Sequence, residues 1–191
     1  MSKVLEDFTT TIPFWQPRVA PIDLEAANAE QLEALKVTPS NTKVSEYVLV
    51  LAHDPESLHT RTPLFNAIMY NRGGMSRAER ELSATGASVF NRCIYCAAVH
   101  ANRYNALTKD ESVMARIFKK GADAQLDKRQ SAILNFSMKL ANTPPDINSS
   151  DMQSLRDVGL QEDEILDLIL SSSLFGWANR LMHTLGDPIE S

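Results

Sequence analysis

Apolar residues recur at helical spacing along most of the chain. An apolar residue at every third or fourth position places those side chains on one face of a helix. Alternation of the strand type is nearly absent, and residues 47–52 (YVLVLA) are the one short stretch that resembles a buried strand. The pattern therefore predicts an all-α fold with seven or eight helices. The clearest positions are Leu24, Leu32 and Leu35, then Ile133, Leu134, Phe136 and Leu140, and finally Ile165, Leu168 and Ile169.

Short sequence signals predict where these helices begin and end. An N-cap residue before proline and two capping boxes indicate helix starts, because their side chains accept hydrogen bonds from free backbone N–H groups. Glycines after an amphipathic segment indicate helix ends, and consecutive prolines indicate a loop. In chain order the signals are Asp54 with Pro55, Gly73 with Gly74, Ser76 with Glu79, Thr108 with Glu111, Gly121, residues 142–150 and Gly159.

The chain is expected to form a single domain. Its 191 residues suffice for one hydrophobic core, and nothing in the sequence requires two. Residues 1–22 contain three prolines and predict an extended arm, which leaves residues 23–191 as one helical domain. Residues 81–101 also align with residues 164–184, so that Glu81 matches Glu164 and His100 matches His183. This match indicates either an internal duplication of a helical hairpin unit or a chance similarity between amphipathic segments.

Composition and charge exclude several classes of partner. A net charge of -5 is unsuited to nonspecific binding of a phosphate backbone, so we expect no nucleic-acid partner. The longest apolar run, residues 165–178, is interrupted by Asp167 and three serines and is too short for a membrane span. The first fifteen residues lack the apolar segment of a secretory signal. We therefore expect a cytoplasmic protein.

The candidate chemistry lies in residues 91–105 (NRCIYCAAVHANRYN), which contain both cysteines of the chain. Cys93, Cys96 and His100 stand at positions i, i+3 and i+7, so a helix would present all three on one face. A CxxC spacing, a nearby imidazole and a helix N-terminus each lower the pKa of a thiol, and a thiol reacts as its thiolate. A redox pair, part of a zinc site and ordinary core packing are the three interpretations. Zinc requires at least three protein ligands, and these three residues supply that minimum.

Glu81 can join this group only if the chain turns. In one continuous helix Glu81 would lie fifteen residues from Cys96, or about 22 Å away. A helical hairpin that turns at Asn91 and Arg92 would instead bring Glu81 level with His100. We therefore predict such a turn, with Glu81 orienting or protonating His100 and His100 serving Cys96.

These residues resemble a known family. The pattern E-x11-C-x-Y-C-x3-H, formed by Glu81, Cys93, Tyr95, Cys96 and His100, is similar to the core signature of the AhpD-like alkylhydroperoxidases within the carboxymuconolactone decarboxylase-like superfamily. The segments SRAERE (residues 76–81) and FGWANRL (residues 175–181) are similar to the peroxidase-related branch of that group. The resemblance covers residues 75–186, with the core signature in residues 75–105.

The resemblance implies an all-helical thiol peroxidase that uses no metal or haem. In the family's scheme Cys96 attacks the hydroperoxide, Cys93 resolves the sulfenic acid as a disulfide, and His100 and Glu81 relay protons. It also implies an external dithiol reductant, such as a dihydrolipoyl protein, and assembly into homo-oligomers, trimer-based or dimeric. Tyr95 is a departure, because well-studied members carry a second histidine at that position.

Two other functions stay open at this stage. The decarboxylase branch of the superfamily implies lyase or hydrolase chemistry on a small lactone or carboxylate, although that branch does not rely on a CxxC pair. A non-catalytic oligomer that senses redox state through the disulfide is the other alternative.

Overall fold

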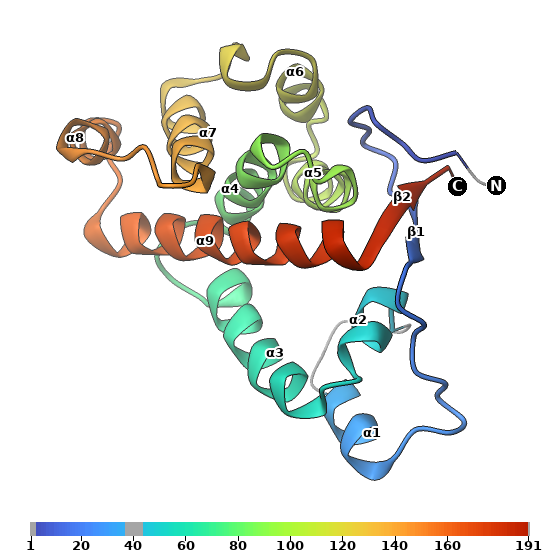
Figure 1. Ribbon diagram of the computed structural model, residues 1–191. Coiled ribbons are helices and arrows are strands. Elements are labelled where there is room, and N and C mark those ends of the chain that lie inside the picture. Colours follow the sequence, from blue (N-terminus) through green and yellow to red (C-terminus); the bar gives the residue numbers. More distant parts are fainter. Residues whose placement is uncertain (1–2, 37–43, 191) are drawn as a thin grey trace.

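The computed structural model describes residues 3–36 and 44–190, and it confirms the predicted all-α architecture (Figure 1). Two short strands, which the sequence pattern did not predict, accompany the helices. The helices in this part of the chain are α1 (Ala29–Leu35), α2 (Glu46–Leu51), α3 (Pro55–Tyr70), α4 (Arg77–Phe90), α5 (Ile94–Thr108), α6 (Ser112–Lys120), α7 (Lys128–Ala141), α8 (Ser149–Asp157) and α9 (Glu162–Leu185). The strands are β1 (Phe14–Pro17) and β2 (Gly186–Ile189).

Helix α4 lies at the centre of the main core. It packs against α5, α7 and α9, and α9 runs along one side of this bundle for its full length (Figure 1). Fully buried apolar side chains from three of these helices meet there, including Leu82, Ile133 and Leu168. Helix α3 leaves the bundle at an angle and carries α1 and α2 at its far end (Figure 1). No helix within the described ranges has both the length and the hydrophobicity that a membrane crossing demands.

The two ends of the described chain lie together. Strand β1 pairs with β2 in antiparallel fashion, with Trp15 opposite Pro188. Gly186 makes this contact possible, because a Cβ at that position would lie 2.5 Å from the Trp15 ring. The N-terminal arm predicted for residues 1–22 therefore packs, at residues 14–17, on its own chain.

Most predicted helix boundaries agree with the structure. The Asp54 side chain accepts a hydrogen bond from the Ser57 N–H at the start of α3, and Ser76 with Glu79 forms the predicted capping box of α4. The predicted box of Thr108 with Glu111 is wrong, since Thr108 is the last residue of α5 and its hydroxyl donates to the Tyr104 carbonyl. A Thr hydroxyl can bond to the preceding turn of its own helix, and here that local partner satisfies it.

Of the two explanations for the match between residues 81–101 and 164–184, the structure supports chance similarity and not an internal duplication. Residues 81–101 form a hairpin of two helices, whereas residues 164–184 lie within the single helix α9. The difference arises at the turn, because Asn91 and Arg92 leave the helical conformation and their aligned partners, Leu174 and Phe175, continue it. The similarity of the two segments reflects amphipathic spacing only.

Candidate functional site

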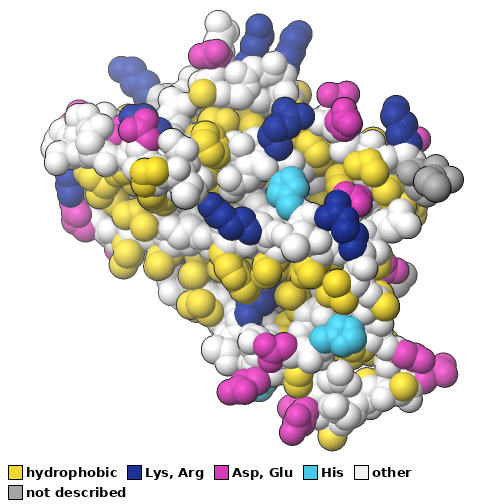
Figure 2. Space-filling model, viewed as in Figure 1, with side chains coloured by type: hydrophobic (Ala, Val, Ile, Leu, Met, Phe, Trp, Pro, Cys, Tyr) yellow, Lys and Arg dark blue, Asp and Glu magenta, His cyan; other side chains and the backbone are white. Residues whose placement is uncertain are grey.

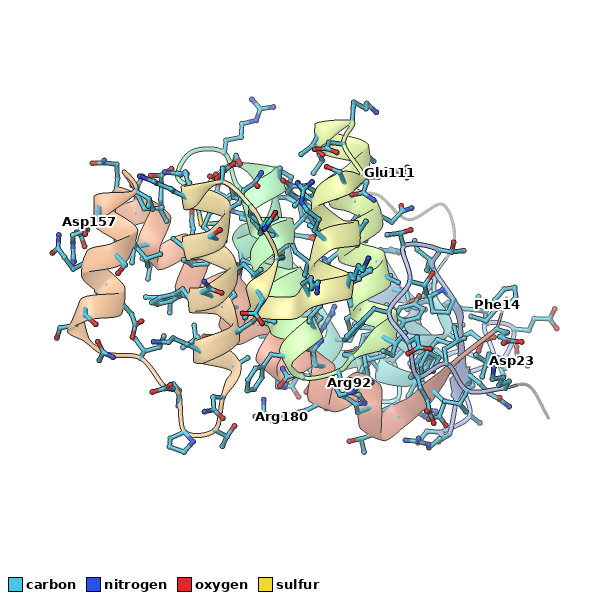
Figure 3. All side chains as sticks on the ribbon, turned by 90° about the horizontal axis from the view of Figure 1, so that it is seen from above. Phe14, Asp23, Arg92, Glu111, Asp157 and Arg180 are labelled. Atoms are coloured by element: carbon cyan, nitrogen blue, oxygen red, sulfur yellow. The ribbon has the colours of Figure 1, made fainter. Side chains whose placement is uncertain are left out.

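The hairpin between α4 and α5 builds the candidate site, as predicted. Asn91 follows the last residue of α4, and Arg92 adopts a φ of 54°, which reverses the chain. Arg92 lies at the tip of this hairpin (Figure 3). The Cys93 N–H then donates to the Ser88 carbonyl at 2.8 Å, and α5 begins at Ile94. Cys93 itself is therefore the N-cap residue of this helix.

Both thiols are free and buried at the N-terminus of α5. Cys93 is 3% exposed and Cys96, in the first turn, is 6% exposed. They pack with Trp15, Tyr47 and Met182 in one apolar cluster. The thiols therefore combine a protected environment with the positive end of a helix dipole, which favours a thiolate.

The two sulfurs differ in their preference for a proton. Hydrogen bonding from the Cys96 thiol, aided by the Cys96 backbone N–H, lowers the pKa of Cys93. The same pairing, together with burial, raises the pKa of Cys96 well above its ordinary value. Of the two thiols, Cys93 therefore gives up its proton more readily than Cys96.

Asn179 of α9 connects the thiols to the hairpin. Its side-chain amide donates to the Ser88 hydroxyl and accepts from the Asn91 amide, both at 3.1 Å. Hydrogen bonding from Asn179 lowers the pKa of both thiols. Asn179 belongs to the segment FGWANRL, but its position beside the thiols depends on how α9 packs in the fold.

Glu81 and His100 are brought together inside the bundle. Both side chains are buried, and His100 Nδ1 donates to one carboxylate oxygen of Glu81 while the Arg77 guanidinium pairs with the other. Burial alone raises the pKa of Glu81, but His100 and Arg77 outweigh it and keep that pKa below its usual value. Burial lowers the pKa of His100, with Glu81 acting in the opposite direction. At neutral pH the cluster therefore holds a carboxylate beside a neutral imidazole.

The predicted link from His100 to Cys96 is absent from the described hydrogen bonds. His100 Nδ1 points to Glu81, and the imidazole ring stacks edge-on against Phe175 with centroids 4.1 Å apart. Tyr95 lies elsewhere: with Cys93 it lines a small cavity of about 140 Å³ that also borders the β1–β2 ribbon. The five residues of the motif thus divide into a thiol cluster and a Glu81–His100 cluster.

Two further residues near the thiols were not predicted. Tyr47 of α2 is nine-tenths buried, its hydroxyl lacks a hydrogen-bond partner, and burial raises its pKa to about 12. The Arg61 guanidinium of α3 lies 5.8 Å from the centre of the Tyr47 ring. Neither residue forms part of a sequence motif, because their proximity depends on how α2 and α3 fold back toward α5.

Residues 3–36 and 44–190 contain no cluster of side chains that could bind a metal ion. Within these ranges no three side chains of His, Cys, Asp and Glu approach one another as a metal site requires. His100 Nδ1 is bonded to Glu81, so this nitrogen is not available as the third ligand of the zinc interpretation.

Comparison with known proteins identifies the fold. The sequence profile of the carboxymuconolactone decarboxylase family matches residues 55–116, which contain α3, α4, α5 and the thiols. No match appears among the curated proteins.

Solved structures match nearly the whole chain. An alkylhydroperoxidase AhpD core, an uncharacterized peroxidase-related protein from Ralstonia eutropha JMP134, superposes with a TM-score of 0.79 at 26% identity, covering 92% of this chain and 93% of that one. A peroxidase-related protein from Silicibacter sp. TM1040 gives 0.74 at 24% identity, with coverage of 88% and 91%. The debrominase Bmp8 gives 0.75 at 15% identity, with coverage of 91% and 92%.

Proposed function

Because this chain belongs to the superfamily of carboxymuconolactone decarboxylase-like and AhpD-like proteins, we propose that it is a thiol peroxidase that reduces hydroperoxides with Cys93 and Cys96. The observation that carries the proposal is the pair of free, buried thiols that lie one turn apart at the N-terminus of α5. Two thiols at this spacing can be joined as a disulfide, which a two-cysteine redox cycle requires and structural packing does not.

In the first step Cys96 attacks the terminal oxygen of the hydroperoxide. The sulfur–oxygen bond forms as the oxygen–oxygen bond breaks, and the proton that leaves the Cys96 thiol passes to the departing alkoxide, which leaves as an alcohol. Cys96 is now oxidised to a sulfenic acid, and the peroxide has been reduced by two electrons.

In the second step Cys93 attacks the sulfur of this sulfenic acid. A disulfide forms between Cys93 and Cys96, and the sulfenic oxygen leaves as water. An external dithiol, of the dihydrolipoyl type, then reduces the disulfide by thiol–disulfide exchange and is itself oxidised to a disulfide. The adjacent positions of the two sulfurs support this step without a large rearrangement.

Glu81 and His100 support the proton transfers in this proposal. An ionised Glu81 that accepts from Nδ1 fixes the imidazole in one tautomer, with Nε2 free to take or give a proton. Arg77 keeps Glu81 ionised inside the bundle. The proposed role of Glu81 and Arg77 is to set the protonation state of His100. Tyr95 packs against the thiol cluster and lines the cavity beside Cys93.

Replacement of Cys96 by serine tests the proposal directly. Peroxide consumption in an assay coupled to a dithiol should fall to the uncatalysed rate in this variant. The matched Cys93→Ser variant should still form one sulfenic acid per chain, detected by dimedone labelling and mass spectrometry, without completing the cycle. Full activity in Cys96→Ser would contradict the assignment of the nucleophile.

The alternative functions predict different results in the same protein. Activity on a lactone or carboxylate that survives complete alkylation of the thiols would favour the decarboxylase-like chemistry. A change in oligomeric state between reduced and oxidised protein, without turnover, would favour a redox sensor. If no peroxide is consumed, the next substrate to test is 2,3,4-tribromopyrrole, with which the debrominase Bmp8 that shares this fold has been crystallised.

A further inference from the structure

Tyr47 of α2 is a buried polar residue of the thiol cluster that the proposed cycle does not use. Its ring packs in the same apolar cluster as Cys93 and Cys96, and the Trp15 ring meets it edge-on with centroids 5.6 Å apart. Only 9% of Tyr47 is exposed, yet its hydroxyl makes no hydrogen bond with any described residue, the two thiols included. A buried hydroxyl without a partner is costly, and native folds keep few of them. An acceptor that forms only in another state of the site would account for this one.

The Tyr47 hydroxyl is suited to donate a hydrogen bond. Burial raises the pKa of Tyr47 to about 12, and the positive charge of Arg61 counters this only in part. The hydroxyl therefore keeps its proton at neutral pH. Negative charge on Cys96 and on Cys93 also raises this pKa, because it opposes a phenolate. The hydroxyl thus lies within electrostatic reach of both sulfurs.

Arg61 of α3 places a positive charge beside Tyr47. Its guanidinium lies 5.8 Å from the centre of the Tyr47 ring, and 4.9 and 5.9 Å from the ring centres of Phe65 and Trp177. It forms no ion pair within the part of the chain that the structure describes, and its Nε atom is buried without a hydrogen-bond partner. Its charge lowers the pKa of Cys96. A cation held among three rings in this way favours negative charge on Cys96 and on any oxygen bonded to it.

Apolar surface covers this part of the site. Apolar atoms gather along the lower edge of α9, where α3 leaves it (Figure 2). Leu51 of α2 and Leu181 of α9 line the groove between α3 and α9 and also pack against the thiol cluster. A hydrogen bond to a charged oxygen is stronger in such apolar surroundings than in water. A donor at this position therefore has a large effect on an oxidised sulfur.

We propose that Tyr47 is a further catalytic residue, whose hydroxyl donates a hydrogen bond to the oxygen that Cys96 gains on oxidation, with Arg61 as a positioning residue. This inference rests on the proposed peroxidase function. When Cys96 becomes a sulfenic acid, the terminal peroxide oxygen is bonded to its sulfur and the remainder of the peroxide leaves as an alcohol. Tyr47 donates to that oxygen without transferring its proton, so the balance of the cycle is unchanged. The hydrogen bond makes the sulfenate a weaker nucleophile toward a second peroxide and preserves it until Cys93 attacks.

Over-oxidation of a single-cysteine protein tests the proposal. In Cys93→Ser no disulfide can form within the chain, so the Cys96 sulfenic acid either persists or reacts with a second hydrogen peroxide to give sulfinic acid and water, which mass spectrometry detects. In this background Tyr47→Phe should raise the rate of over-oxidation about tenfold, the effect of one hydrogen bond to a charged acceptor. Tyr104→Phe is the matched control, because Tyr104 is buried in the main core and its hydroxyl accepts from Gln130 at 3.1 Å. Equal rates in the two variants, or a slower rate in Tyr47→Phe, would overturn the proposal.

Two further measurements distinguish this role from a structural one. In the Cys93→Ser background, Tyr47→Phe should leave the pH midpoint of Cys96 alkylation in place, because the hydroxyl does not bond to the reduced sulfur. Its melting temperature should not fall, since the hydroxyl that is lost has no partner. Arg61→Met should move the alkylation midpoint to higher pH, and Arg61→Lys should restore it. A shifted midpoint in Tyr47→Phe, or an unshifted one in Arg61→Met, would overturn the proposal.

The role of Tyr47 and the peroxidase function can fail separately. Excess hydrogen peroxide oxidises Cys96 in Cys93→Ser without any turnover. Over-oxidation that depends on Tyr47, with no catalytic consumption of peroxide by the wild type, would overturn the peroxidase function and support the role of Tyr47. Catalytic consumption with equal over-oxidation rates in Tyr47→Phe and Tyr104→Phe would overturn the role of Tyr47 alone. Absence of any sulfenic or sulfinic acid at Cys96 would overturn both.

Discussion

The Glu81–His100 cluster and the thiol cluster both lie along α5, but they differ in how their charge is compensated. Around Glu81 a full negative charge is matched by the Arg77 guanidinium and by the imidazole N–H of His100, all within the bundle. Around the thiols no described ion pair is present, and the partners are a second thiol, a backbone N–H and a neutral amide.

The Glu81–His100 cluster therefore holds a fixed charge, whereas the thiol cluster can gain or lose a proton. A buried ion pair resists any change of protonation, because removal of one partner leaves an uncompensated charge. A thiol surrounded by neutral donors near a helix N-terminus can lose its proton and regain it at much lower cost. The first cluster is therefore suited to positioning, and the second to reaction.

The largest effect is expected from Glu81→Ala, which breaks the fixed cluster. Arg77 and His100 would lose their carboxylate while they remain buried or half-buried, so we expect a loss of about 3–5 kcal/mol in the free energy of unfolding. Urea unfolding followed by circular dichroism measures it. The exposed Glu111→Ala is the control and should stay within about 0.5 kcal/mol of the wild type. Similar values for the two variants would mean that Glu81 carries no buried charge.

A smaller effect is expected from Asn179→Ala, which removes a neutral donor from the movable cluster. Loss of its hydrogen bonding raises the pKa of Cys93, so the midpoint of thiol alkylation should move to higher pH, by about one pH unit. The rate of iodoacetamide labelling as a function of pH provides the measurement. Asn102→Ala, an exposed change in α5, should leave the midpoint in place. A midpoint that moves downward in Asn179→Ala would contradict the role of the amide.

The smallest effect is expected from the titration of His100, which makes the free energy of unfolding depend on pH. Its folded pKa is lowered from the ordinary value of about 6.5, so the neutral ring stabilises the fold fully above that pH and less as the pH falls toward the folded pKa. We expect the free energy of unfolding to decrease below about pH 6.5, by at most about 1.4 kcal/mol per pH unit. Glu81, whose pKa is also lowered, adds to this decrease only below about pH 4.5. His100→Gln should flatten the curve between pH 6.5 and 4.5, and an unchanged slope in that variant would exclude His100 as the source.

The sequence predicted the parts of the site that depend on local spacing. The turn at Asn91 and Arg92, the start of α4 at Ser76 and the approach of Glu81 to His100 all follow from helix geometry over about twenty residues. The false duplication arose from the same information, because amphipathic spacing is shared by a hairpin and by a single helix. The hairpin differs from the single helix only in the conformation of Asn91 and Arg92, which amphipathic spacing does not reveal.

Residues that reach the site from other helices could not be predicted in the same way. Tyr47, Arg61 and Asn179 come from α2, α3 and α9, and their contacts with the thiols depend on tertiary packing. Only the motif around Asn179 gave a local signal. The β1–β2 ribbon was missed for a related reason, since two four-residue strands far apart in the chain carry too little alternation to be read as partners.

The pairing of the two chain ends has a practical consequence for every experiment on this protein. Val4 and Leu5 on one side, and Gly186 to Pro188 on the other, border the cavity beside Cys93, and both ends emerge together there (Figure 1). A purification tag or fusion partner joined at either end would lie close to this cavity. Rates of peroxide and reductant reactions should therefore be measured on protein from which such extensions have been cleaved.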